Sequence, residues 1–96
     1  MREYTTKQVK SLLSEAVNLL DVREVDEVAE VKIPGVINIP LGLLEFRMHE
    51  LDKSKEYIVI CRSGGRSAKA TKFLGSHGFS VINMTGGMLA WEGPTE

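Results

Sequence analysis

The sequence predicts an α/β domain, a parallel β-sheet flanked by helices on both faces. Short apolar runs alternate with segments whose apolar residues recur at helical spacing, and short connections join them, which is typical of strand–helix–strand units. The clearest run, EYIVIC at 56–61, is continuously apolar, as in strands buried on both faces of a parallel sheet. A chain of 96 residues supports one core, so residues 1–96 are expected to form one domain.

The elements of the N-terminal half are predicted from apolar spacing and turn signals. Thr5 and Gln8 have the spacing of a capping box, which starts a helix. The turn pair at 34–35 and Pro40 bound a short strand. In order, this half is expected to hold a helix with apolar residues from Val9 to Ala16, a strand over 17–22, a short helix over 24–30 and a strand over 36–39.

The C-terminal half follows the same alternation. Leu41, Leu44, Met48 and Leu51 recur at helical spacing, and Gly78 stands where a glycine commonly ends a helix. In order, the elements expected after residue 51 are a strand over 56–61, a helix over 66–77, a strand over 80–84 and a short terminal helix holding Leu89 and Trp91.

Composition narrows the function classes. A formal net charge of −1 gives no broad electrostatic reason to expect nucleic acid or a membrane surface as a partner. No apolar run approaches the ~18 residues that span a bilayer, and the N-terminus lacks the apolar core of a signal peptide. One cysteine forms no internal disulfide, and His49 and His77 lack the spacing of metal ligands. We therefore expect a cytoplasmic monomer without metal or cofactor.

The chemically informative segment is CRSGGRS at 61–67, which joins the most apolar strand to the most convincing helix. In open α/β sheets, ligand sites lie outside the carboxyl ends of the strands. Two glycines let the backbone curl with its N–H groups pointing inward, and the start of a helix adds a partial positive charge. The segment therefore predicts an anion site.

Cys61 lies at the floor of this predicted site. A lone cysteine that ends an apolar strand is usually a small core residue. Here the backbone dipoles, Arg62 and Arg66 all favour thiolate over thiol, so the pKa of Cys61 should fall below its free value of ~8.5. Glycines flanked by two arginines and two serines favour the catalytic interpretation over core packing. Short loops should leave Cys61 open enough for a protein thiol.

The segment resembles the active-site loop of the rhodanese-like domain, in which a cysteine, a few variable residues with glycine and then Arg-Ser open a helix. Three further motifs in the right order are similar to signatures of that family. They are LLDVRE at 19–24, IPGVINIP at 33–40 and GGMLAW at 86–91. The resemblance spans nearly the whole chain.

The resemblance implies an enzyme of the thiosulfate sulfurtransferase type. The Cys61 thiolate would attack the sulfane sulfur of a small anionic donor such as thiosulfate and become a persulfide. Cyanide or a thiol, on a small molecule or on a protein, would then remove the outer sulfur. The Arg66 side chain would neutralise charge. The loop residues implied to bind persulfide and donor are Arg62, Ser63, Gly64, Gly65, Arg66 and Ser67.

Two features leave alternatives open. In the family an aspartate like Asp21 helps to fix the loop, but Asp21 and Arg23 are equally well interpreted as a cap or ion pair at a strand end. Val31 and Lys32 stand where the family often has Gly-His, so altered packing is expected there rather than lost chemistry.

Two other functions compete with sulfur transfer. Phosphatases and arsenate reductases of the same fold have five residues between the cysteine and the arginine, whereas four separate Cys61 from Arg66. A non-catalytic rhodanese-like binding module is disfavoured because such modules commonly lose the cysteine.

Overall fold

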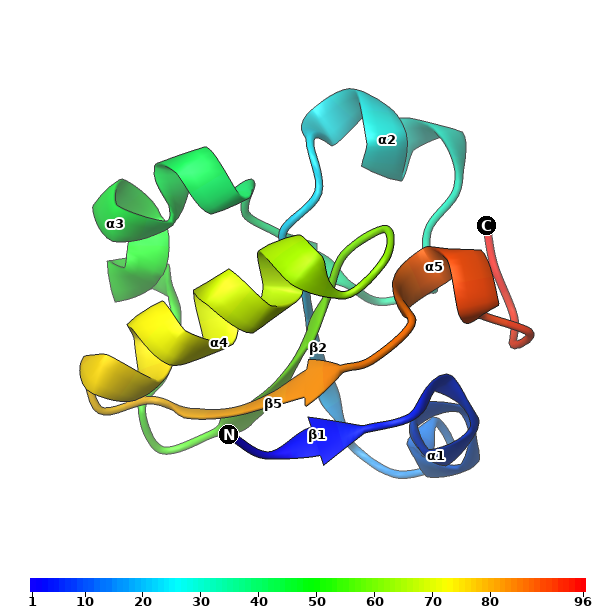
Figure 1. Ribbon diagram of the computed structural model, residues 1–96, viewed down its shortest axis with the longest axis horizontal. Coiled ribbons are helices and arrows are strands. Elements are labelled where there is room, and N and C mark those ends of the chain that lie inside the picture. Colours follow the sequence, from blue (N-terminus) through cyan, green and yellow to red (C-terminus); the bar gives the residue numbers. More distant parts are fainter.

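The computed structural model describes all residues 1–96 and contains a five-stranded sheet whose paired strands are all parallel (Figure 1). The strand order is β1-β5-β4-β2-β3. The strands are β1 (Glu3–Tyr4), β2 (Asn18–Asp21), β3 (Ile37–Asn38), β4 (Glu56–Ile60) and β5 (Ser80–Met84). Because β4 pairs with both β2 and β5, the loop that follows it leaves from the middle of the sheet.

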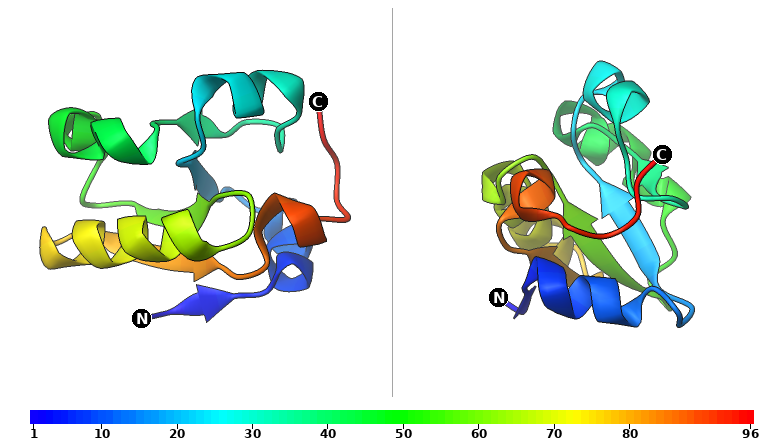
Figure 2. Two further views of the ribbon diagram at one scale, coloured as in Figure 1. Left: turned by 45° about the horizontal axis from the view of Figure 1, so that its top comes forward. Right: turned by 90° about the vertical axis from the view of Figure 1, so that its right-hand side faces the viewer.

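Helices cover both faces of this sheet (Figures 1 and 2). They are α1 (Thr6–Leu12), α2 (Val25–Glu30), α3 (Leu44–Arg47), α4 (Gly65–Ser76) and α5 (Gly87–Ala90), and two 3-10 turns, η1 (Leu41–Leu43) and η2 (Met48–Glu50), flank α3. Residues of α3 and α4 pack on one face, and residues of α1 and α5 pack on the other. The predicted α/β architecture is confirmed. No helix here has the length and apolar character that a membrane crossing requires.

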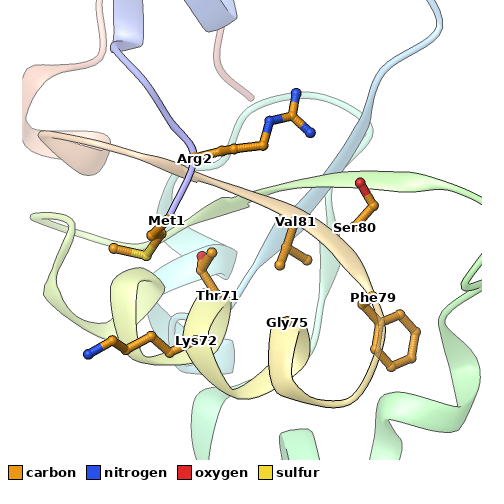
Figure 3. A pocket seen from close by; sticks show the side chains of 8 residues that line it. All are labelled: Met1, Arg2, Thr71, Lys72, Gly75, Phe79, Ser80 and Val81. Atoms are coloured by element: carbon orange, nitrogen blue, oxygen red, sulfur yellow. The ribbon is translucent and has the colours of Figure 1, made fainter.

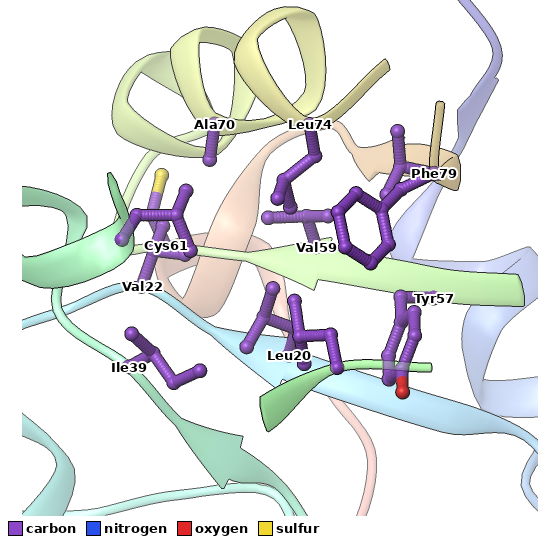
Figure 4. Packing of buried hydrophobic residues seen from close by; sticks show 12 residues of the cluster. Leu20, Val22, Ile39, Tyr57, Val59, Cys61, Ala70, Leu74 and Phe79 are labelled. Carbon is purple, nitrogen blue, oxygen red and sulfur yellow. The ribbon is translucent and has the colours of Figure 1, made fainter. Parts of the chain in front are cut away.

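Two apolar clusters, one on each face, form the core. Along β4 the side chains alternate between them, because successive residues of a strand point to opposite faces. Tyr57, Val59 and Cys61 belong to the cluster under α4, whereas Ile58 and Ile60 belong to the other. Figure 4 shows the Cys61 side chain at the end of β4, on the same side as Ala70 and Leu74 of α4. The alternation therefore places the thiol beneath the start of α4.

The predicted ends of the helices are confirmed in part. Thr5 and Gln8 form the capping box, in which the Gln8 N–H donates to Thr5 Oγ1 at 3.1 Å and the Thr5 N–H donates to Gln8 Oε1 at 2.8 Å. Gly78 has a φ of 88°, as a glycine beyond a helix end requires. However, α1 ends at Leu12 rather than at Ala16, because the chain turns there and the Glu15 N–H donates to the Leu12 carbonyl.

The structure differs from the sequence-based expectations in four other details. The two-residue strand β1 was not predicted, because its pairing with β5 leaves no periodic pattern in so short a segment. The segment 41–51 is not one helix but α3 between two 3-10 turns. Helix α4 begins at Gly65, one residue before its predicted start. Trp91 has extended backbone angles and lies just beyond the end of α5.

Candidate active site

The candidate site lies at the carboxyl ends of three neighbouring strands. Cys61 follows β4 in the centre, Asp21 ends β2 on one side, and the Gly86-Gly87 turn follows β5 on the other. Three of the four motifs that resemble the rhodanese-like family, distant in sequence, therefore meet at one edge of the sheet. This is where ligands bind in open parallel sheets.

The Cys61 sulfur is held by the loop that follows it. The Gly64 N–H donates to Sγ at 3.0 Å, and Ser67 Oγ lies 3.3 Å from Sγ. The Ser67 hydroxyl also lies 3.1 Å from the Gly64 carbonyl oxygen, to which it donates. Since a hydroxyl hydrogen rotates, it can turn from that carbonyl to the sulfur when Cys61 loses its proton. The loop thus offers donors to a thiolate without moving its backbone.

These contacts set the acidity of the thiol. Burial is the largest single influence and raises the pKa of Cys61, but hydrogen bonds from the Ser67 hydroxyl and from the N–H groups of Ser67, Gly64 and Ser63 together outweigh it. The pKa of Cys61 is therefore lowered from its ordinary value, as predicted. The cause differs from the prediction in one respect, since hydrogen bonds rather than arginine charges dominate the lowering.

The accessibility of Cys61 contradicts the sequence-based expectation. The residue is 0% exposed, so the prediction of a thiol open to a protein partner is wrong. The reason is the closure of the loop, in which Gly64 and Ser67 contact the sulfur from above.

The turn after β5 fixes the carbonyl groups of the cysteine loop. The Met88 N–H donates to the Cys61 carbonyl and the Leu89 N–H donates to the Arg62 carbonyl, both at 2.9 Å. Gly87 has a φ of 59°, and a Cβ there would collide with the Arg62 carbonyl and lie 2.6 Å from the Cys61 oxygen. Only glycine permits this approach. Sequence reasoning noted the Gly86-Gly87 motif but missed this role.

The two glycines of the cysteine loop are not equivalent. Gly64 has a φ of 106°, and a Cβ there would lie 3.3 Å from the Gly86 nitrogen. Gly65 has no positive φ, and a Cβ there would have no neighbour within 4 Å. The structure therefore requires glycine at position 64 and not at position 65.

The two arginines of the loop have different environments. Arg62 is exposed and forms no ion pair. Arg66 donates from Nη1 to Glu27 Oε1 at 2.6 Å and from Nη2 to Glu27 Oε2 at 2.9 Å. The hydrogen bond from Arg66 is the main reason that the pKa of Glu27 is lowered to about 2. The predicted charge-neutralising arginine is thus already paired with a carboxylate that sequence reasoning did not single out.

Asp21 and Arg23 form a buried ion pair. Arg23 Nη2 lies 2.9 Å from Asp21 Oδ2, and these side chains are 4% and 0% exposed. Arg23 also donates to the carbonyl oxygens of Val31 at 2.7 Å and Glu27 at 3.4 Å, so the pair secures the end of α2. No hydrogen bond joins Asp21 to the loop 61–67. The ion-pair interpretation of these residues is confirmed.

Val31 and Lys32, at which altered packing is predicted, lie beside the end of the chain. Lys32 and Glu96 exchange two backbone hydrogen bonds, with the Lys32 N–H donating at 3.0 Å and the Glu96 N–H at 2.8 Å. The last residues of the chain therefore pack beside the connection that precedes β3.

A surface pocket of about 400 Å³ lies away from this site, between α4 and the β1 edge of the sheet (Figure 3). Its lining includes Arg2, Thr71, Lys72 and Val81, and none of the residues 61–67. This pocket is therefore separate from the loop that surrounds Cys61.

Comparison with known proteins agrees with this geometry. Residues 5–94 match the family model of the rhodanese-like domain. The chain is 45% identical, over all of its length and 95% of the other protein, to the Bacillus subtilis protein named "Putative sulfurtransferase YtwF". It is 38% identical to a protein of Allochromatium vinosum named "Sulfurtransferase", over 81% of this chain and 74% of that protein.

Solved structures give the same result. A rhodanese-like domain protein from Staphylococcus aureus superimposes with a TM-score of 0.92 at 34% identity, covering 97% of this chain and 93% of that chain. The relatives support sulfur transfer as the general class of function. The chain belongs to the rhodanese-like domain family.

Proposed function

We propose that residues 1–96 form a cytoplasmic sulfurtransferase domain that moves a sulfane sulfur from a donor such as thiosulfate to a thiol or cyanide through a persulfide on Cys61. The observation that carries the proposal is the hydrogen-bonded sulfur at the start of α4, whose pKa is lowered although the residue is buried. A thiolate among anion donors is suited both to attack sulfur and to store it as an anion.

The first half-reaction conserves atoms and charge. The Cys61 thiolate attacks the outer sulfur of thiosulfate, the S–S bond of the donor breaks, and sulfite leaves with the bonding electron pair. The new outer sulfur carries the negative charge, and N–H groups between Arg62 and Ser67 stabilise it. In the second half-reaction, cyanide or a thiolate attacks this outer sulfur, and Cys61 leaves as the thiolate.

The burial of Cys61 separates the two partners of the reaction. A donor must reach Sγ itself, which is enclosed, whereas an acceptor needs only the outer sulfur of the persulfide. We therefore propose that the loop opens for a small anionic donor. A thiol acceptor, on a small molecule or on a protein, then approaches the persulfide without touching Sγ.

Mass spectrometry tests the function directly. The protein is incubated with thiosulfate, and the intact mass is measured before and after addition of cyanide, with Cys61→Ser as the control. We expect one added sulfur atom on the wild type, its loss to thiocyanate after cyanide, and neither event in the variant. If the wild type gains no sulfur and forms no thiocyanate, a non-catalytic binding module replaces this proposal.

A further inference from the structure

Arg66, in the first turn of α4, is not free to bind an anionic sulfur donor. Its guanidinium forms two parallel hydrogen bonds with the Glu27 carboxylate, at 2.6 and 2.9 Å, and the two side chains are 35% and 29% exposed. This bidentate arrangement is the strongest geometry available to an arginine and a carboxylate. Any anion that is to use Arg66 must therefore compete with Glu27.

Glu27 is fixed in place from its own side. Its Oε1 also accepts the Glu24 N–H at 3.0 Å, which closes the capping box of α2. Its carbonyl oxygen accepts a hydrogen bond from Arg23, and Arg23 is held in turn by the buried Asp21. The carboxylate is thus part of a connected network and not a freely rotating surface group.

The charge on Glu27 is permanent under working conditions. With a pKa of about 2, the carboxylate is ionised at and around neutral pH. The positive charge of Arg66 is therefore largely cancelled at the site. Arg62 remains unpaired, but it is exposed and its charge is screened by water.

We propose that Glu27 is a specificity-determining residue that acts through Arg66 and disfavours dianionic sulfur donors relative to monoanionic donors of the same shape. The inference rests on the proposed sulfur transfer. The charge of the Arg66 guanidinium is largely cancelled by the Glu27 carboxylate. A second negative charge on the sulfur donor is therefore attracted little by Arg66 and is repelled by Glu27.

Two sulfur donors of similar shape differ by this one negative charge and can be compared directly. Thiosulfate transfers its outer sulfur to the Cys61 thiolate and leaves as sulfite, a dianion. Methanethiosulfonate has a methyl group in place of one oxygen of thiosulfate and carries one negative charge fewer. It also transfers its outer sulfur to the Cys61 thiolate, and its leaving group is methanesulfinate, a monoanion. In both reactions one S–S bond breaks and one forms, and the leaving group takes the electron pair.

The experiment measures kcat and KM for both donors, with cyanide as acceptor, in the wild type and in Glu27→Gln. We expect the ratio of kcat/KM for thiosulfate to that for methanethiosulfonate to rise about fivefold in the variant, mainly through a lower KM for thiosulfate. Asp26→Asn, which removes one charge from the same helix, and Glu27→Asp, which keeps the charge, should each leave the ratio near the wild-type value.

The outcomes separate the inference from the proposed function. An equal loss of rate with both donors in Glu27→Gln means that Glu27 is merely structural, and it overturns the inference while sulfur transfer stands. A wild type that accepts neither donor overturns the proposed function. Independently of transfer, the rate of Cys61 alkylation by iodoacetate relative to neutral iodoacetamide should rise about fivefold in Glu27→Gln. An unchanged ratio there also overturns the inference.

Discussion

The turn that follows β4 and the turn that follows β5 have similar structures but different roles. Each carries a glycine pair between a parallel strand and a helix, and in each the first glycine is left-handed, Gly64 at 106° and Gly86 at 80°. The second glycines differ. Gly65 has open space around it, whereas Gly87 lies directly against the carbonyl groups of Cys61 and Arg62.

The difference shows where the shape of the site comes from. The turn after β4 carries the thiol and the charged side chains, whereas the turn after β5 contributes glycines and backbone N–H groups. Those N–H groups bind the carbonyl oxygens of Cys61 and Arg62, so these two carbonyls point toward α5. A segment without reactive side chains therefore orients the segment that has them.

The strongest way to break this arrangement is Gly87→Ala. A Cβ would collide with the Arg62 carbonyl, and alanine would also have to adopt a φ of 59°. We expect a loss of about 3 kcal/mol of unfolding free energy, and persulfide formation reduced about 100-fold as the loop loses its support. Urea denaturation and intact mass after thiosulfate treatment measure the two effects. Wild-type values in both would disprove the role assigned to the second turn.

Gly64→Ala should have the next largest effect. Alanine at a φ of 106° is strained, and its Cβ would lie 3.3 Å from the Gly86 nitrogen, which is a backbone atom. We expect a loss of about 2 kcal/mol in unfolding free energy and slower alkylation of Cys61, because the Gly64 N–H no longer reaches Sγ. An unchanged urea midpoint would show that the two turns do not interlock.

Ser67→Ala tests the electrostatics of the first turn without straining its backbone. The Ser67 hydroxyl stabilises the thiolate, so its removal should raise the pKa of Cys61 and shift the pH profile of iodoacetamide alkylation to higher pH. At a fixed pH below that pKa the rate should fall about fivefold. Ser76→Ala, which removes an exposed hydroxyl from the same helix, is the control and should leave the profile unchanged. A profile unshifted in Ser67→Ala would contradict the assignment.

Gly65→Ala should have the smallest effect. The position has ordinary backbone angles and open surroundings, and alanine favours helix more than glycine. We expect unfolding free energy unchanged or higher by about 0.5 kcal/mol, with normal sulfur uptake. A marked loss of sulfur uptake with normal stability would show that the loop needs flexibility at this point, which would weaken the contrast with Gly87.

The parts of the molecule that the sequence predicts are those with local patterns. The apolar run at 56–61 and the capping box at Thr5 are each legible within a few residues, and each is confirmed. The loop after β4 is legible in the same way and places the Gly64 N–H on the Cys61 sulfur, whereas its binding of anions stays a prediction. The pairing of Arg66 with Glu27 joins residues 39 apart and leaves no local pattern. The burial of Cys61 escaped prediction because it depends on how the loop folds back over the sulfur.

The hydrogen bonds from α5 to Cys61 and Arg62 also set an order of assembly. During translation, Cys61 is synthesised before α5. A domain folds as a unit once its segments are present. Until Met88 and Leu89 have docked, no contact from α5 holds the Cys61 and Arg62 carbonyls in place. In a nascent chain, the Cys61 and Arg62 carbonyls are therefore fixed by α5 only after residues 88 and 89 have been synthesised and have packed against the loop.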